Sequence, residues 1–143
     1  MSQNKPIILL DPYPRAMELL FSKENLNYLK KNFKLITAPN KNKNNFYEKN
    51  LPKADYIFGQ PNLPTYLISQ STKLKAIFNV ESNFMDNMDY DYCFRKGIHV
   101  LATSPVFAQP VAEMAMGLTL SIARSIHIAH SDFISKKEKY GGA

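Results

Sequence analysis

The chain has 143 residues, 45% of them hydrophobic, which suits one α/β domain with a sizeable core, and its nine phenylalanines and eight tyrosines argue against disorder. Its formal net charge of +6 is spread along the sequence and comes from fifteen lysines and three arginines, so we expect no nucleic-acid partner, because arginine is the residue favoured for planar phosphate and base contacts. The single Cys93 excludes an internal disulfide and, with a polar start that does not resemble a signal peptide, predicts a cytoplasmic protein.

Short apolar runs recur along the chain, separated by amphipathic or polar stretches. An apolar run bounded by turn residues is typical of a strand, and apolar residues at helical spacing indicate a helix. We therefore predict strands at residues 7–10, 34–38, 54–59, 74–80 and 98–102. Helices are predicted near residues 14–20, 26–33, 46–50, 63–70 and 86–97. The last of these is expected to begin at Asp86 as its N-cap and to end at Gly97.

This alternation of strand and helix predicts a doubly wound parallel sheet. The run 74–80 is apolar almost throughout, as expected of a strand that is covered on both faces. Right-handed crossovers then give a five-stranded, flavodoxin-like α/β fold, in which ligands bind beyond the carboxyl ends of the strands. That rule directs attention to residues 11–13, 59–62, 81–83 and 103–109.

A long apolar helix is predicted at residues 109–130, with Pro110 in its first turn. It would be ~33 Å long, and apolar residues cover almost its whole circumference. Glu113 and Arg124 lie inside the run, and each would cost roughly 2.5 to 3.5 kcal/mol at the centre of a bilayer, so we expect no membrane insertion. The helix instead predicts protein partners on several sides, namely a second domain, a second subunit, or both.

Several short motifs follow one another in a distinctive order. They are Leu-Lys-Ala-Ile-Phe at 74–78 with Asp-Asn-Met-Asp at 86–89, Arg-Lys-Gly-Ile at 95–98, and Pro-Val-Ala-Glu-Met-Ala at 110–115 with Ala-Arg at 123–124. In this order and spacing, the segment from Lys73 to about Ile126 resembles the D-isomer-specific 2-hydroxyacid dehydrogenases, the family that includes phosphoglycerate, glycerate and formate dehydrogenases. Residues 1–50 fit that family only in pattern.

The resemblance implies two Rossmann-like domains with the active site in the cleft between them, and NAD or NADP as the cofactor. It assigns residues 1–102 to a substrate-side domain, 103–108 to an inter-domain hinge, and 109–143 to a crossover helix and the start of a nucleotide-binding domain. The family's catalytic Arg, Glu or Asp, and His all follow that domain, and none of them is assigned here. Gly141-Gly142 lies about where the family's G-x-G-x-x-G turn would begin. We therefore expect a truncated chain that is inactive alone, binds no cofactor tightly and forms a homodimer through the 109–130 helix.

The resemblance also implies which residues face the substrate, a small 2-hydroxy or 2-keto acid. In the family, backbone amides and polar groups at strand ends hold the substrate carboxylate, and the corresponding positions here are Gln60, Val80, Glu81, Ser82 and Asn83. Turn formation is the alternative role of Ser82 and Asn83, since both residue types favour local hydrogen bonds. Val111 is expected near the nicotinamide in a complete enzyme.

Two departures from the family pattern leave the substrate open. Residues 80–85 replace a glycine-rich turn with a segment that has no glycine and one extra residue. Within that segment, Glu81 adds negative charge near an expected anionic substrate, unless it points away or meets a cationic or hydroxyl-bearing group. Phe107 occupies a position that is often polar in the family.

Other site chemistries receive less support from the sequence. His127 and His130 have helical spacing suited to a metal, but a third ligand is lacking nearby. Glu113 is interpreted as an acid in the first turn of the long helix, favoured by the helix dipole. Cys93 is predicted to be a small core residue rather than a nucleophile.

Two functional alternatives remain. One is a stand-alone interaction or dimerisation module of the same fold, in which the apolar helix forms the interface. The other is a flavodoxin-like response regulator, in which Asp11 would be part of an acidic site at a strand end. Such a site also needs an aspartate at the end of the third strand, and this chain has Gly59 and Gln60 there instead.

Overall fold

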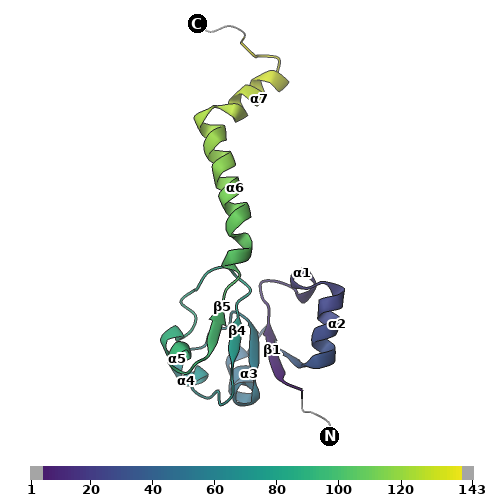
Figure 1. The fold of residues 1–143 in the computed structure, drawn as a ribbon, viewed down its shortest axis with the longest axis vertical. Coiled ribbons are helices and arrows are strands. Elements are labelled where there is room, and N and C mark those ends of the chain that lie inside the picture. Colours follow the sequence, from purple (N-terminus) through teal and green to yellow (C-terminus); the bar gives the residue numbers. More distant parts are fainter. Residues whose placement is uncertain (1–4, 140–143) are drawn as a thin grey trace. The chain divides into compact units, whose positions relative to one another are not determined.

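The computed structural model describes residues 5–139 and divides the chain into two compact units, with the division between Ser104 and Pro105. The first unit contains one sheet and the helices that connect its strands (Figure 1). Its strands are β1 (Ile7–Asp11), β2 (Lys34–Thr37), β3 (Tyr56–Gly59), β4 (Ala76–Phe78) and β5 (His99–Leu101). Its helices are α1 (Met17–Leu20), α2 (Lys23–Asn32), α3 (Lys43–Asn50), the 3₁₀ turn η1 (Leu51–Lys53), α4 (Thr65–Ile68) and α5 (Tyr90–Arg95).

All five strands pair in parallel, in the spatial order β2-β1-β3-β4-β5. This is the flavodoxin-like order, so the predicted fold class is confirmed. The strand order changes direction between β1 and β3, which makes their carboxyl ends the topological switch point of the sheet. In such folds ligands bind at that edge.

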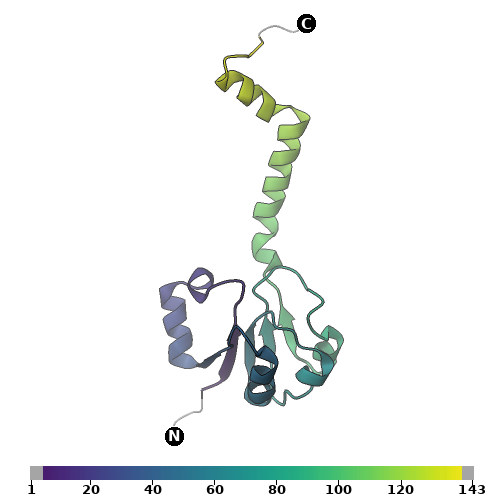
Figure 2. The same cartoon turned by 180° about the vertical axis from the view of Figure 1, so that it is seen from behind.

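One face of the sheet carries the main core, where α3, α4 and α5 pack (Figures 1 and 2). Alternate residues of the strands point to this face, and those of the central strands are fully buried together with apolar side chains of the three helices. The central members of this cluster are Leu9, Ile57, Ile77, Tyr47, Leu67 and Cys93. The prediction that Cys93 is a core residue is therefore confirmed.

The other face carries a row of aromatic rings. Phe21, between α1 and α2, lies 4.9 Å from the ring of Phe58, and Phe33, after α2, lies 6.2 Å from the ring of Tyr56. Further along the same face, Phe78 in β4 remains 37% exposed. The helices of the first unit thus cover this face less completely than the opposite one.

The start of α5 differs from the prediction. Its N-cap is Asp89, not Asp86: Oδ1 of Asp89 accepts a hydrogen bond from the Tyr92 amide at 2.8 Å, and Oδ2 accepts one from the Thr65 hydroxyl at 2.6 Å. Asp86 and Asn87 lie in a turn before it, and Met88 forms an isolated parallel bridge with Leu63, whose amide donates to the Asn87 carbonyl at 2.7 Å. The predicted end at Gly97 is confirmed, since this glycine has a φ of +71°.

The long apolar helix is present but begins earlier and is broken. It consists of α6 (Ser104–Ala123) and α7 (Ile126–Ile134), and the break is at Ser125, which has a left-handed φ of 52°. Pro110 therefore lies inside α6, where it removes one backbone hydrogen bond, while Pro105 lies in the first turn. The interpretation of Glu113 as a first-turn acid is wrong, because it lies mid-helix and accepts a hydrogen bond from Gln109 Nε2 at 2.8 Å.

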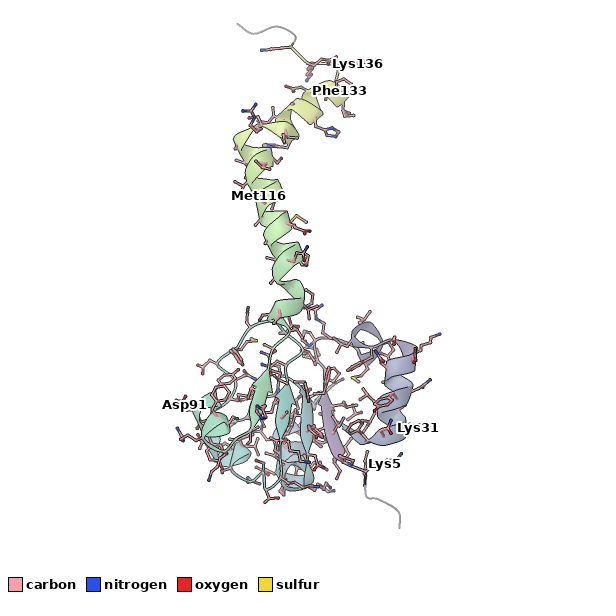
Figure 3. All side chains as sticks on the ribbon, viewed as in Figure 1. Lys5, Lys31, Asp91, Met116, Phe133 and Lys136 are labelled. Atoms are coloured by element: carbon pink, nitrogen blue, oxygen red, sulfur yellow. The ribbon has the colours of Figure 1, made fainter. Side chains whose placement is uncertain are left out.

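No residue of α6 or α7 is buried, and apolar side chains, Met116 among them, surround α6 (Figure 3). By length and composition alone, α6 meets the criteria for a helix that crosses a membrane. A single helix of this kind is weak evidence, because core helices of water-soluble proteins meet the same criteria. The Gly141-Gly142 pair lies outside the described residues.

Candidate functional site

The carboxyl ends of four strands lie side by side at one edge of the sheet. Strand register places Asp11 of β1 beside Gly59 of β3, and Phe58 of β3 beside Phe78 of β4, which in turn pairs with Leu101 of β5. The segments that follow these strands include every substrate-side residue predicted from the sequence. We call residues 79–85, after β4, the β4 loop.

Gly59 permits the close approach of β1 and β3 at this edge. It has a φ of +146°, and a Cβ atom at this position would lie 2.1 Å from the carbonyl oxygen of Asp11. A side chain therefore cannot be placed here without moving one of the two strands. The switch point of the sheet depends on this glycine.

Asp11 forms a buried polar cluster at the end of β1. Its carboxylate is 4% exposed and lies 2.6 Å from Nζ of Lys43, and it accepts a hydrogen bond of 3.1 Å from the Tyr47 hydroxyl. Burial, and then the neighbouring Asp11 charge, raise the pKa of Tyr47 far above its usual range, so that Tyr47 stays a proton donor to the carboxylate. Lys43 also lies 5.6 Å from the centre of the Tyr13 ring. The cluster fixes the segment after β1, and no local sequence pattern joins its members.

The structure brings four of the five predicted substrate-side residues together. Nε2 of Gln60 donates a hydrogen bond to the Asn83 carbonyl at 2.9 Å, which links the segment after β3 to the β4 loop. The Ser104 hydroxyl, at the start of α6, donates to the Ser82 carbonyl. Val80, the fifth residue, has its side chain buried, so only its backbone is available to a ligand.

Glu81 has a partner that sequence reasoning missed. Its Oε1 lies 3.1 Å from Nε of Arg15 and its Oε2 lies 3.5 Å from Nη2, so that one edge of the guanidinium faces the carboxylate. The hydrogen bond and the charge of Glu81 raise the pKa of Arg15 above its already high value. The negative charge expected to oppose an anionic substrate is therefore offset by a positive charge from the segment after β1.

The backbone N–H groups of residues 80–84 donate no hydrogen bond to any group within residues 5–139. The next amide, that of Met85, donates to the Tyr90 hydroxyl at 3.2 Å, and this hydroxyl also lies 2.8 Å from the Met85 carbonyl oxygen. These N–H groups are available to donate to a ligand, and a carboxylate can accept hydrogen bonds from several backbone N–H groups.

Buried polar atoms also lack partners at this edge. They are Oε1 of Gln60, both side-chain amide atoms of Asn79, and the hydroxyl of Thr103, considering only the part of the chain that the structure describes. Each follows one of the three neighbouring strands β3, β4 and β5. Since buried polar groups are normally hydrogen-bonded, these positions have a capacity for water or ligand atoms.

The remaining predicted site residue, Val111, lies on α6 in the other unit and is 62% exposed. Its assignment to the cofactor stays a prediction. Among the described residues, no three His, Cys, Asp or Glu side chains form a group able to hold a metal ion.

Comparison with known proteins gives partial matches to oxidoreductases. No family model matches the chain. Hydroxypyruvate reductase of Thermotoga maritima is 32% identical over 133 residues, which are 91% of this chain and 40% of that enzyme. A solved phosphoglycerate oxidoreductase from Rhizobium etli is 38% identical with a TM-score of 0.75, over 96% of this chain and 43% of that one. D-lactate dehydrogenase from Aquifex aeolicus, solved with NAD and lactic acid, has a TM-score of 0.53 at 21% identity, over 95% and 39% of the two chains; this last likeness shows the fold alone.

The chain is thus similar to D-2-hydroxyacid dehydrogenases over nearly all of its own length. It spans less than half the length of these relatives. The resemblance predicted from the motifs between residues 73 and 126 is confirmed.

Proposed function

We propose that this chain is the substrate-side part of an NAD(P)-dependent 2-hydroxyacid dehydrogenase. The observation that supports this most directly is the match to the Rhizobium etli phosphoglycerate oxidoreductase, which covers almost the whole of this chain and less than half of that enzyme. In the proposal, residues 1–102 are the substrate-side domain, 103–108 the hinge, and 109–143 the crossover helix with the start of a nucleotide-binding domain.

The β4 loop receives the substrate carboxylate in this proposal. The unpaired N–H groups of residues 80–84 supply donors, and Gln60, Ser82 and Asn83 add neutral polar side chains to the segments at this edge. Backbone N–H groups suit a carboxylate because each donates one hydrogen bond to a charged acceptor. Val111 contributes an apolar contact on the side of the nicotinamide.

A nicotinamide cofactor, when bound, supplies the acceptor or donor of the hydride. This chain's own residues bind and orient the 2-hydroxy or 2-keto acid, and they include no assigned proton-transferring group. The chain alone is therefore proposed to be inactive, to bind NAD or NADP weakly, to reside in the cytoplasm and to pair with a second copy through residues 109–130.

A chimera tests the proposal. The 143-residue chain is joined to the part of the Rhizobium etli enzyme that it does not match, and oxidation of NADH and NADPH is followed with glyoxylate, hydroxypyruvate and pyruvate. We expect turnover by the chimera and none by the 143-residue chain or by the added part alone. Turnover by the 143-residue chain itself would contradict the proposal that the catalytic residues lie outside this chain. A folded chimera that binds NADH yet reduces none of the acids would contradict the proposed substrate class.

A stand-alone interaction module is the second candidate. It is favoured by one observation, the exposure of apolar residues along α6 and α7. Both candidates predict self-association through this apolar surface, so the chimera separates them. Turnover by the chimera supports the part-enzyme, whereas a folded chimera that binds NADH without any turnover favours the module.

A further inference from the structure

We infer that Arg15 is a positioning residue for the β4 loop: through its ion pair with Glu81 it holds the amides of residues 80–84 in the conformation that receives a carboxylate. This inference rests on the proposed function, since it concerns the same carboxylate site. It adds a residue from the segment after β1, which neither the sequence motifs nor the relatives assign to the site.

The β4 loop has no internal feature that fixes its backbone. It contains no glycine, and none of its residues has a positive φ. Residues in ordinary backbone conformations leave many loop shapes accessible, so a single shape must be selected by bonds to other segments.

The two ends of the loop are bonded to other segments, Asn79 to Leu101 and Met85 to Tyr90. Between these ends, three bonds act on three successive residues, and each comes from a different part of the chain. Arg15 pairs with Glu81, Ser104 donates to the Ser82 carbonyl, and Gln60 donates to the Asn83 carbonyl. The second and third bonds occupy carbonyl oxygens. Neither bond uses an N–H group, so the N–H groups of residues 80–84 stay available to a ligand.

The bond from Arg15 differs from the other two because it joins two charged side chains. Arg15 is itself held in place, since its amide donates to the Pro12 carbonyl at 2.7 Å in a turn that directly follows β1. Lys43, which pairs with the buried Asp11 at the end of β1, also lies 5.6 Å from the centre of the Tyr13 ring in that turn. A chain of contacts thus connects the core of the sheet to Glu81.

The ion pair is partly exposed, with side-chain exposures of 53% for Arg15 and 31% for Glu81. Exposed pairs have modest strength and are screened by salt. We therefore expect loss of the pair to leave the fold intact, to increase the mobility of the loop, and to weaken carboxylate binding by about two- to fivefold.

Nuclear magnetic resonance on the 143-residue chain tests the inference. The ¹⁵N order parameters of residues 80–84 and the binding of D-glycerate are measured for the wild type, Arg15→Gln, Glu81→Gln and the charge-reversed double variant Arg15→Glu with Glu81→Arg. Arg95→Gln, which removes the same charge from α5, is the matched control. We expect lower order parameters and about two- to fivefold weaker binding in both single variants, recovery of both in the double variant, and no change in the control.

Glu81→Gln is the decisive variant. Removal of a negative charge near an anion would by itself strengthen binding, whereas loss of the tether weakens it. Tighter D-glycerate binding by Glu81→Gln, or single variants whose order parameters and affinities equal those of the control, would overturn the inference. Spectra of the remaining residues report whether each variant is folded.

The same experiment separates failure of the inference from failure of the proposed function. If D-glycerate shifts no signal of residues 80–84 in the wild type, the proposed substrate role of the β4 loop is contradicted. The order parameters of the ligand-free variants still decide whether Arg15 and Glu81 hold the loop.

Discussion

Asp55, just before β3, has a carboxylate that contacts the start of β1 and the segment before β4. Its Oδ2 accepts a hydrogen bond from the Ile7 amide at 2.8 Å and lies 3.2 Å from Nζ of Lys73. Burial by itself would raise the pKa of Asp55, but the Ile7 N–H group and the positive charge of Lys73 outweigh it, so that the pKa lies below its usual range. The charged form therefore stabilises the folded state.

This lowered pKa predicts a pH-dependent contribution to stability. The unfolded chain binds a proton at Asp55 more readily than the folded chain, so the contribution is complete above the unfolded value of about pH 4 and is lost as the pH falls through the lower folded value. Asp55→Asn should lower the free energy of unfolding by roughly 1–2 kcal/mol near neutral pH, and the difference from wild type should shrink below about pH 4.

Urea unfolding from about pH 7 to about pH 3 measures this difference. Asp91→Asn is the control, since Asp91 lies exposed on α5 (Figure 3). A difference between Asp55→Asn and wild type that stays constant across the acid range, or grows as the pH falls, would show that the carboxylate charge does not provide the stabilisation.

Contacts between side chains that are distant in the sequence are the part of the site that could not be predicted. The positions of Gln60 and Asn83 were predictable, because parallel strands bring their carboxyl ends to one edge and both residues follow strands. Arg15 was not, because its partner lies 66 positions further along the chain and no local pattern links the two. The Asp11 cluster with Lys43 was hidden for the same reason.

At the scale of elements, the close approach of β1 to β3 predicts that replacing Gly59 lowers the stability of the first unit. Gly59→Ala should lower the free energy of unfolding of the first unit by roughly 3 kcal/mol or more, because the new Cβ would overlap the backbone of Asp11 and the φ of +146° is strained for alanine. Gly117→Ala is the matched control: Gly117 lies inside α6, and a Cβ atom added there would have no neighbour within 4 Å, so alanine should favour the helix by up to about 1 kcal/mol.

Circular dichroism during urea unfolding gives both values. A Gly59→Ala protein as stable as the wild type would mean that the two strands separate at no cost, and the switch point would then not depend on the glycine. Loss of helical signal in Gly117→Ala would contradict the helical assignment of its segment.

The sequence predicted which strands and helices the chain forms better than it predicted the residues at which the helices begin. Five apolar runs bounded by turn residues predicted five strands, and all five are present. The helix starts were harder. Asp86 and Asp89 both satisfy the capping rule for α5, and the hydrogen bond from Thr65 to Asp89 favours the later residue. Pro105 and Pro110 both satisfy the first-turn rule for α6, and no local rule separates them. The break at Ser125 contains no glycine or proline and left no sequence signal.

At the scale of the whole molecule, the two units differ in how they bury apolar residues. The first unit encloses a cluster around Leu9, Ile57 and Ile77, whereas α6 and α7 bury none of their residues. Large apolar surfaces that remain exposed in water favour association. The apolar side chains of α6 and α7 that are more than half exposed are Val106, Val111, Met114, Met116, Leu118, Leu120, Ile122, Ile126, Ile128, Phe133 and Ile134.

We therefore expect the chain to associate with itself through α6. Leu118 and Ile122 are 56% and 70% exposed and lie one helical turn apart, so they occupy one stripe of the helix. The double variant Leu118→Glu with Ile122→Glu places two charges on that stripe and should shift the mass measured by light scattering from a dimer or larger species toward that of one chain. Tyr28→Glu, at a 64% exposed position on α2, is the control and should leave the mass unchanged. An unchanged mass in the double variant would exclude this stripe of α6 as the interface, and an equal shift in Tyr28→Glu would assign the association to the first unit.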